Sequence, residues 1–300
     1  MQSSLALSLG LPAVLCIIML GLGLSLKLDD FRAVIRHPKP VFIGLVCQVL
    51  LLPALCLALV HVAQLPPSMA VGMMLLAASP GGTSATLYTH LARGDVALSI
   101  TLTAITSALS IITLPPIVNF SLMLLYVETD PVYLELRQVL QIFAIAIVPA
   151  AIGVVIQSRY PRLAVRMEGP VKIIATVFLV VIVLFALISQ WGLLTTWGTT
   201  VGVAVLAFNL MSLAVGYYVP RLLKVDLRQS IALALSISMH NAALVIAIAM
   251  SDQLLANSEM AIPPAGYGLI AYITGGILVW VFNRRTRSSL PIGSPAARGG

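Results

Sequence analysis

Two short polar stretches interrupt apolar segments of the sequence, and their residue types point to ligand binding. The first reads SPGGTS at positions 79–84, and the second holds Ser236, Ser238, His240 and Asn241. Proline costs a helix interior about 3 kcal/mol and glycine about 1 kcal/mol, so the first stretch should break its helix. A broken helix exposes N–H groups that attract anions and carbonyl oxygens that coordinate cations. We therefore expect a site for small charged ligands at these breaks.

The same residues also have a purely structural interpretation. Proline, glycine, serine and threonine are common in membrane helices, where they fill helix contacts or bond back to the helix. A single histidine such as His240 often does no more than hydrogen-bond a neighbouring helix. Its position beside Asn241 favours a site residue instead, and a titratable side chain there would permit proton coupling. Thr83 and Ser84 would cap the half-helix that follows the first break.

The rest of the chain predicts an all-α integral membrane protein. Of its 300 residues 60% are hydrophobic and only 9% are charged, with a mean hydropathy of +1.05, whereas a soluble domain carries about 25% charge. The apolar runs are too long for barrel strands. We expect one transporter unit over residues 1–287 and a disordered cytoplasmic tail over 288–300. Nine transmembrane helices are predicted, at about residues 5–27, 38–63, 68–92, 94–125, 132–158, 168–191, 196–221, 227–251 and 264–283.

The charged residues predict how these helices lie in the membrane. With the N-terminus outside, 16 of the 17 Lys and Arg residues fall in connections on the inner side, and Arg137 is the exception. This bias predicts a cytoplasmic C-terminus. Separately from the charge pattern, we expect the membrane to be a bacterial inner membrane. The net charge of +7 then follows from topology, and no nucleic-acid partner is expected. All ten Asp and Glu residues lie in connections or at helix ends, which argues against a buried carboxylate relay.

The positions of the two breaks predict an internal inverted repeat. They fall in the third and the eighth predicted helix, and a single amide, Gln48 or Asn209, stands about thirty residues before each. Corresponding interrupted helices in two halves are typical of transporters built from inverted repeats. The first repeat would cover about residues 1–125 without its first helix, and the second about 132–283.

Four stretches carry a family resemblance. SPGGT is followed at 88–103 by YTHLARGDVALSITLT, and the others are LKLDDFRAVIRHPKP at 26–40, CQVLLLP at 47–53 and SMHNAALVIAIA at 238–249. Together they resemble the bile acid:sodium symporter family from about residue 26 to the last span. The resemblance implies a fold of ten helices in a panel domain and a core domain, of which this chain lacks the first helix.

The resemblance also implies site residues, and at several of them this chain departs from the family pattern. For a first sodium ion, Ser99 and Thr103 match, Ala85 and Thr86 stand where a Ser-Asn pair is usual, and Ser236 replaces a glutamate. For a second ion, Gln48 matches, His240 replaces a glutamine, and backbone carbonyls come from Ile237 and Met239. Substrate would be bound at Thr83, Ser84, His240 and Asn241. Loss of the glutamate predicts weakened sodium coupling, because a carboxylate offsets much of the cost of dehydrating the ion.

These observations predict a secondary transporter of a small organic anion that works by alternating access. Its ligand would be bile-acid-like, a keto acid or another monocarboxylate or sulfonate, with sodium or a proton as the coupling ion and no other cofactor. An uncoupled facilitator or channel of the same fold is the alternative. An intramembrane enzyme is not expected, because the sequence has no HExxH motif and no buried carboxylate for acid–base chemistry.

Overall fold

The computed structural model describes residues 16–17, 19–21, 23–24, 38–82, 84–125, 136–189, 191–251 and 254–288. Thr83, most of the first predicted span and the tail from residue 289 lie outside the described residues. The elements are α3 (Pro38–Val46), a π-helical segment η1 (Cys47–Leu51), α4 (Leu52–Val62), α5 (Pro67–Ala78), α6 (Ser84–Leu91), α7 (Val96–Leu125), α8 (Leu136–Arg159), α9 (Pro161–Ser189), α10 (Trp191–Leu222), α11 (Leu227–Ser238), α12 (Ala242–Met250), a 3₁₀ turn η2 (Glu259–Ala261) and α13 (Ile262–Ser288).

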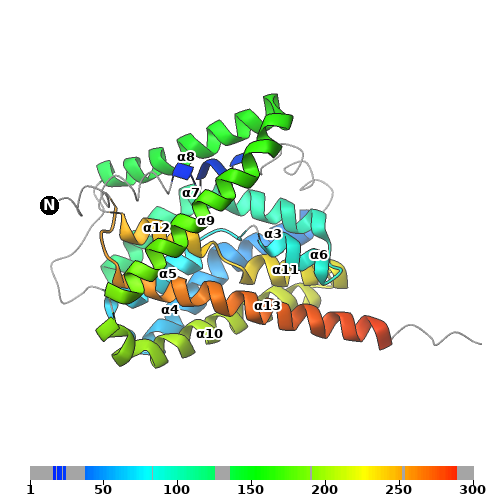
Figure 1. The fold of residues 1–300 in the computed structure, drawn as a ribbon. Helices are drawn as coiled ribbons and strands as arrows, with labels where there is room; N and C mark the ends of the chain where they lie inside the picture. The colour runs from blue at the N-terminus through cyan, green and yellow to red at the C-terminus, as the bar shows by residue number, and fades with distance from the viewer. Residues whose placement is uncertain are drawn as a thin grey trace, which may run out of the picture.

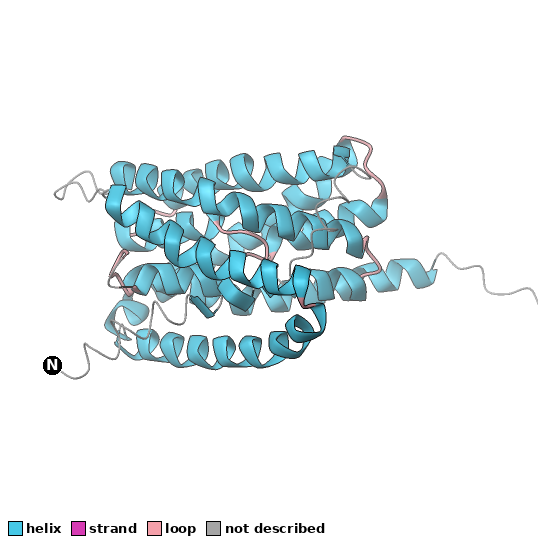
Figure 2. Ribbon diagram, turned by 90° about the horizontal axis from the view of Figure 1, so that it is seen from above, coloured by secondary structure: helices cyan, strands magenta, loops and turns pink. Residues whose placement is uncertain are grey.

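The helices lie side by side along the long direction of the molecule (Figure 2). In Figure 1, α8 and the adjoining end of α9 project from one side of the bundle, and α13 extends beyond the others at its C-terminal end. The described residues among positions 16 to 24 pack against α8, and two glycines, Gly23 and Gly153, lie where they meet. A Cβ on Gly23 would lie 2.0 Å from the Ala150 carbonyl oxygen, and one on Gly153 would lie 2.6 Å from that of Leu20. Only glycine permits this approach of two helix backbones.

Three helical stretches in the described part are long and apolar enough to cross a membrane. They are Pro38–Val62, Thr195–Leu222 and Glu259–Arg284, and α7 provides a fourth if its two arms form one span. The arms of α7 meet at 58°. Pro115 and Pro116 explain the bend, because each lacks the N–H that would bond to the carbonyl four residues earlier. The all-α fold class is confirmed for the described residues, whereas nine crossings remain a prediction.

One helix boundary differs clearly from the sequence prediction. The helix expected at 168–191 begins at Pro161, so Arg162 and Arg166 lie in the first turns of α9 and not in a connection. Proline is favoured in the first turn of a helix, where its missing N–H costs nothing. Because the helix begins at this proline, it includes the charged residues that precede the apolar segment.

Both interrupted segments run through the centre of the bundle. Every residue of α5 from Ser68 to Ala78 is buried, and so is every residue of α11 from Ser230 to Ser238. A helix that is buried on all faces lies inside a bundle and not at its lipid-facing surface. The two breaks, between α5 and α6 and between α11 and α12, are thus held by packing on every side.

Candidate binding site at the crossing of two broken helices

The two breaks meet as a short antiparallel crossing. Gly81 and His240 face each other in an isolated β-bridge. The Asn241 N–H donates to the Pro80 carbonyl at 2.9 Å, and the Gly82 N–H donates to the Met239 carbonyl. A Cβ on Gly81 would lie 3.0 Å from the Ser236 carbonyl oxygen, so this close approach favours glycine. Residues that break the helices in sequence thus pair with one another in space.

A buried amide holds the last carbonyl before each break. Gln48 Nε2 donates to the Ser79 carbonyl at 3.4 Å, and Asn209 Nδ2 donates to the Ser238 carbonyl at 3.3 Å. The second carbonyl also accepts the Tyr267 hydroxyl at 2.5 Å. These carbonyls lie at helix C-terminal ends, where they have no partner within the helix. The two amides noted in the sequence therefore have the same structural role in the two halves.

The turns on either side of the breaks correspond as well. In the described part of the chain, four non-glycine residues have a positive φ: Gln64 (49°), Arg93 (58°), Lys224 (59°) and Ala256 (48°). Gln64 and Lys224 precede the helices that lead into the breaks, whereas Arg93 and Ala256 follow the helices that lead out. This shared order is what an internal duplication would produce.

His240 lies in an aromatic enclosure beside the first break. Its ring stacks on Phe208 with centroids 5.5 Å apart and meets the Tyr267 ring edge-on at the same distance. Nδ1 lies 3.4 Å from the Ser79 carbonyl oxygen, which Gln48 also contacts. Among the described residues, Nε2 of His240 and Oε1 of Gln48 are buried without a hydrogen-bond partner. Both side chains therefore converge on one carbonyl and keep a free acceptor or donor each.

The hydroxyls expected at a first cation site are brought together. Ser99 Oγ and Ser236 Oγ are 2.8 Å apart, and Thr89 Oγ1 donates to Ser99 Oγ at 3.3 Å. All three side chains are fully buried or nearly so. Thr103 lies next to them, since its Oγ1 would be 3.4 Å from a Cβ on Gly81. This Oγ1 is buried with no partner in the described part of the chain.

Other expected site residues have different surroundings. Ala85 is buried, whereas the half-buried Thr86 makes no hydrogen bond to Ser99, Thr103 or Ser236. The Met239 carbonyl accepts the Gly82 N–H, which leaves it one lone pair for another partner. Thr83, expected to bind substrate, lies outside the described residues.

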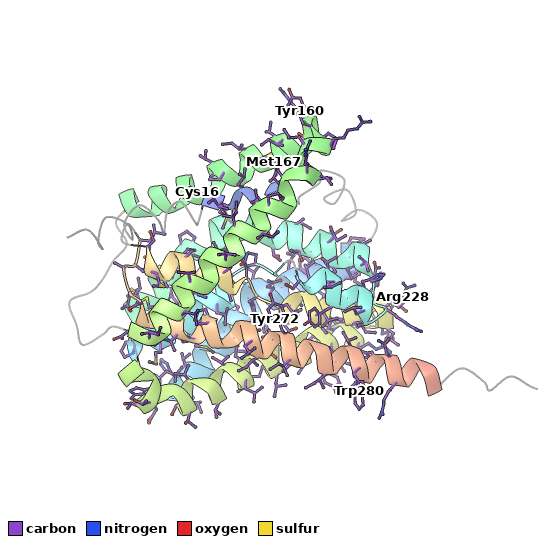
Figure 3. All side chains as sticks on the ribbon, in the orientation of Figure 1. Cys16, Tyr160, Met167, Arg228, Tyr272 and Trp280 are labelled. Carbon is purple, nitrogen blue, oxygen red and sulfur yellow. The ribbon has the colours of Figure 1, made fainter. Side chains whose placement is uncertain are left out.

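The two remaining substrate candidates stand at helix starts. Asn241 is the N-cap of α12, and its Oδ1 accepts the Leu244 N–H at 3.1 Å. Ser84 begins α6, and its Oγ lies 3.1 Å from the hydroxyl of Tyr272 on α13. Figure 3 shows Tyr272 near the middle of the molecule. Ser84 and Asn241 are thus partly buried at the starts of two half-helices, and Tyr272 brings α13 beside the first of them.

Three contributors were not anticipated from the sequence. Thr89 lies one helical turn after Ala85 on the same face of α6. Its hydroxyl donates to Ser99, which the short Ala85 side chain does not do. Tyr267 and Tyr272 come from α13, more than 25 residues after the second break, and no local pattern marks them. Tyrosines near a membrane span end are expected as interfacial anchors, and only the fold shows that these two face the crossing.

The oxygen atoms at the crossing are all neutral. Buried Asp or Glu is absent from the described residues, and no group of three His, Cys, Asp or Glu side chains forms a metal site there. Hydroxyl, amide and carbonyl oxygens suit a hard monovalent cation. Without a carboxylate they compensate less of its dehydration. The residues present therefore fit one weakly held cation better than two.

Comparison with known proteins agrees with this geometry. The Sodium Bile acid symporter family matches residues 12–197. The chain belongs to this family. It is 27% identical over 276 residues to the "Probable sodium/metabolite cotransporter BASS1, chloroplastic" of Arabidopsis thaliana, which covers 92% of this chain and 67% of the relative. It is 26% identical over 272 residues to the "Uncharacterized sodium-dependent transporter YocS" of Bacillus subtilis, covering 90% of this chain and 82% of the relative. The protein is thus a multi-pass membrane transporter and not an enzyme.

Proposed function

We propose that this family member is a secondary active transporter of small organic anions. The observation that carries the proposal is the crossing itself, where α6 and α12 both begin beside the paired segments 80–82 and 239–241. Each helix start carries a partial positive charge of about half an elementary charge. Two such starts match one carboxylate or sulfonate group. The protein's relatives include a sodium/metabolite cotransporter, which supports a small-molecule cargo.

The charges nearby favour a monoanion. No Lys or Arg is buried among the described residues, so the crossing offers dipoles and polar side chains but no full positive charge. A multiply charged anion would keep uncompensated charge in a low-dielectric site, which is costly. The ligand's charged group would lie near Asn241 and Ser84, with Thr83 and His240 beside them.

Transport would proceed by alternating access between two bodies. One body is the tightly packed bundle that contains both broken helices, and the other is formed by residues 16–24 with α8 and the adjoining end of α9, which project from it (Figure 1). In transporters with inverted repeats, one bundle rocks against the other around a fixed central site. The matched amide contacts of Gln48 and Asn209 support such a repeat here.

Coupling to sodium is expected to be weak in this protein. Ser99 and Ser236 hydrogen-bond each other, and Thr89 completes the set, so the hydroxyls of the first ion site satisfy one another. Gln48 Oε1 and Thr103 Oγ1 remain as buried oxygens without a partner in the described part. They would hold at most one sodium ion. His240, whose Nε2 has no described partner, is the group that would carry a proton instead.

Uptake into proteoliposomes tests the proposal. Taurocholate, pyruvate and pantoate serve as labelled probes, with an inward sodium gradient, an inward proton gradient or neither. A secondary transporter accumulates a probe above its equilibrium level under one gradient, whereas a facilitator only equilibrates it. A saturating millimolar sodium response would contradict weak coupling. Loss of the proton-driven component in His240→Gln, with equilibration kept, would assign that role to His240. Accumulation of none of these organic anions would overturn the proposal.

A further inference from the structure

One face of α7 carries a continuous series of buried hydroxyls. Ser99, Thr103, Thr106, Ser107 and Ser110 are each at most 9% exposed. With about 100° of rotation per residue, all five fall within about 60° of the Thr103 direction. Two of them are tied to the crossing, since Ser99 bonds Ser236 and Thr106 accepts the Gly81 N–H at 3.4 Å. The series therefore starts at the crossing and continues beyond it.

Two of these hydroxyls are buried without a protein partner. Thr103 Oγ1 and Ser107 Oγ have no hydrogen bond in the described part of the chain, although the two residues are only 7% and 9% exposed. Leaving a buried polar group unpaired costs about 1–3 kcal/mol. The residues stand one turn apart on the same face. A small polar species that reaches both oxygens would remove this cost.

The hydrogen-bond pattern on this face favours a cation. Thr106 donates its hydroxyl hydrogen to the Thr103 carbonyl at 3.2 Å, and Ser110 donates to the Ser107 carbonyl at 2.9 Å. Their hydroxyl hydrogens are thus turned back to the helix, and the oxygen lone pairs are left for other groups. The unbonded hydroxyls of Thr103 and Ser107 can also turn their lone pairs toward a ligand, so this face can present a series of acceptor oxygens to a cation.

The series leads away from the Arg93 end of the molecule. α7 begins just after Arg93, and Ser107 and Ser110 lie progressively further along it than Thr103. Beyond Ser110 the helix bends, and Pro115 and Pro116 provide no N–H for the carbonyls of residues 111 and 112. Two carbonyls without a helix N–H partner therefore lie further along α7 than the hydroxyl series.

We propose that this hydroxyl face of α7 is the route by which a small monovalent cation, with part of its water, reaches the crossing from the end opposite Arg93. Thr103 and Ser107 are the contact points next to the crossing, and Ser110 is the next one outward. The proposal deepens the function proposed above, because a coupling cation needs a way into a site that is buried on all sides.

Silver ion is the probe for this route, because it is a small monovalent cation that binds thiols. Thr103→Cys and Ser107→Cys are reconstituted in liposomes, and the loss of free thiol is followed in time after silver is added. Thr101→Cys is the matched control, because Thr101 is 1% exposed on another face of α7 and its hydroxyl is bonded to the Ala97 carbonyl at 2.8 Å. The parent measures the background of Cys16, Cys47 and Cys56.

We expect the thiols at positions 103 and 107 to react about tenfold faster than the thiol at 101, since reactivity follows access. Sodium in place of choline should slow the reaction at 103. Equal rates at 101, 103 and 107 would overturn the route, and if Ser107→Cys does not fold, Ser110→Cys decides in its place. The result is independent of transport: fast reaction without anion uptake would leave the route standing and refute the proposed function.

Discussion

Asn241 has two roles that single substitutions can separate. Its Oδ1 caps α12 through the Leu244 N–H, whereas its Nδ2 is a hydrogen-bond donor that could meet the anion proposed to lie near Asn241. Asn241→Ala should therefore lower stability by about 0.5–2 kcal/mol through the lost cap and also weaken binding. Asn241→Ser keeps a capping oxygen, so only binding should fall, by about 1–3 kcal/mol.

Thermal unfolding with and without the transported probe anion measures both effects on the same samples. A ligand stabilises the folded state in proportion to its affinity, so binding is seen as a shift of the unfolding temperature. If Asn241→Ser were stabilised by the probe as much as the parent, Asn241 would be a cap alone. The sequence predicted the binding role of this residue but not the cap, which makes the alanine variant a poor test of function.

Ser236 is the second residue at which function can be tested, because it stands where the family has a carboxylate. Ser236→Glu would place a negative charge next to Ser99 in a site that is almost fully buried. A buried carboxylate without a counter-ion is strongly unfavourable, so sodium should stabilise this variant, by about 1.4 kcal/mol at ten times its Kd. Ser236→Gln has nearly the same size without the charge and should not respond.

Unfolding temperatures in sodium chloride and in choline chloride measure this difference. Equal responses of the Glu and Gln variants would show that the oxygens at the crossing do not surround a cation. The outcome also tests how far residue types predict a site. Gln48 and Asn209 could be recognised because single amides are rare in apolar spans. The Ser99–Ser236 pair followed only from the family resemblance, since hydroxyls are frequent on these helices and the residues are 137 positions apart.

At the level of the elements, the breaks were predictable and their neighbours were not. Proline and glycine act on the chain locally, so the end of α5 at Ala78 could be read from SPGGT alone. α13 supplies Tyr267, Tyr272 and Thr274 to the site through tertiary packing, and its sequence resembles that of any apolar span. The start of α9 at Pro161 was missed because charged residues were taken to mark a connection.

The glycines at the crossing give a prediction about these elements. Gly81→Ala would bring a Cβ to 3.0 Å from the Ser236 carbonyl oxygen and 3.4 Å from Thr103 Oγ1, which pushes the two broken helices apart. Overpacking of this kind should lower stability by about 1–3 kcal/mol and reduce anion uptake. Gly202 in α10 is the control, because nothing lies within 4 Å of a Cβ there.

Gly202→Ala should leave uptake unchanged and raise the unfolding temperature slightly, since alanine favours a helix by about 1 kcal/mol over glycine. Unfolding temperature and initial uptake rate are measured for both variants and the parent. Equal behaviour of the two alanine variants would mean that the approach of the broken helices at Gly81 is not needed for the site.

At the scale of the whole molecule, the contacts separate two ends. The Arg228 side chain bonds the Arg93 carbonyl at 3.2 Å, and Asn283 Nδ2 bonds the Leu91 carbonyl at 3.0 Å, so three parts of the chain share one end. Arg228 and the projecting end of α13 lie on the same side in Figure 3. At the other end, Ser68 Oγ donates to Glu259 at 2.6 Å. Arg93 and Arg228, two of the basic residues predicted to be cytoplasmic, thus lie together at one end of the bundle.

This separation predicts which exposed positions are reached from each side of the membrane. Leu223 and Ala256 are both exposed, and they flank the second broken segment, with Leu223 at the Arg228 end and Ala256 near Glu259. In whole cells, a thiol reagent that does not cross membranes should label Ala256→Cys but not Leu223→Cys, which should react only after lysis. Cys47 and Cys56 are buried and Cys16 is half-buried, so the parent provides the background.

Labelling of Leu223→Cys alone would place the Arg93 end outside and contradict the orientation predicted from 16 of 17 basic residues. Labelling of both positions from one side would mean that α11 and α12 enter and leave through the same surface. A broken segment that returns to the surface it entered from would not connect the crossing to both sides of the membrane. The alternating-access proposal would then be wrong together with the predicted topology.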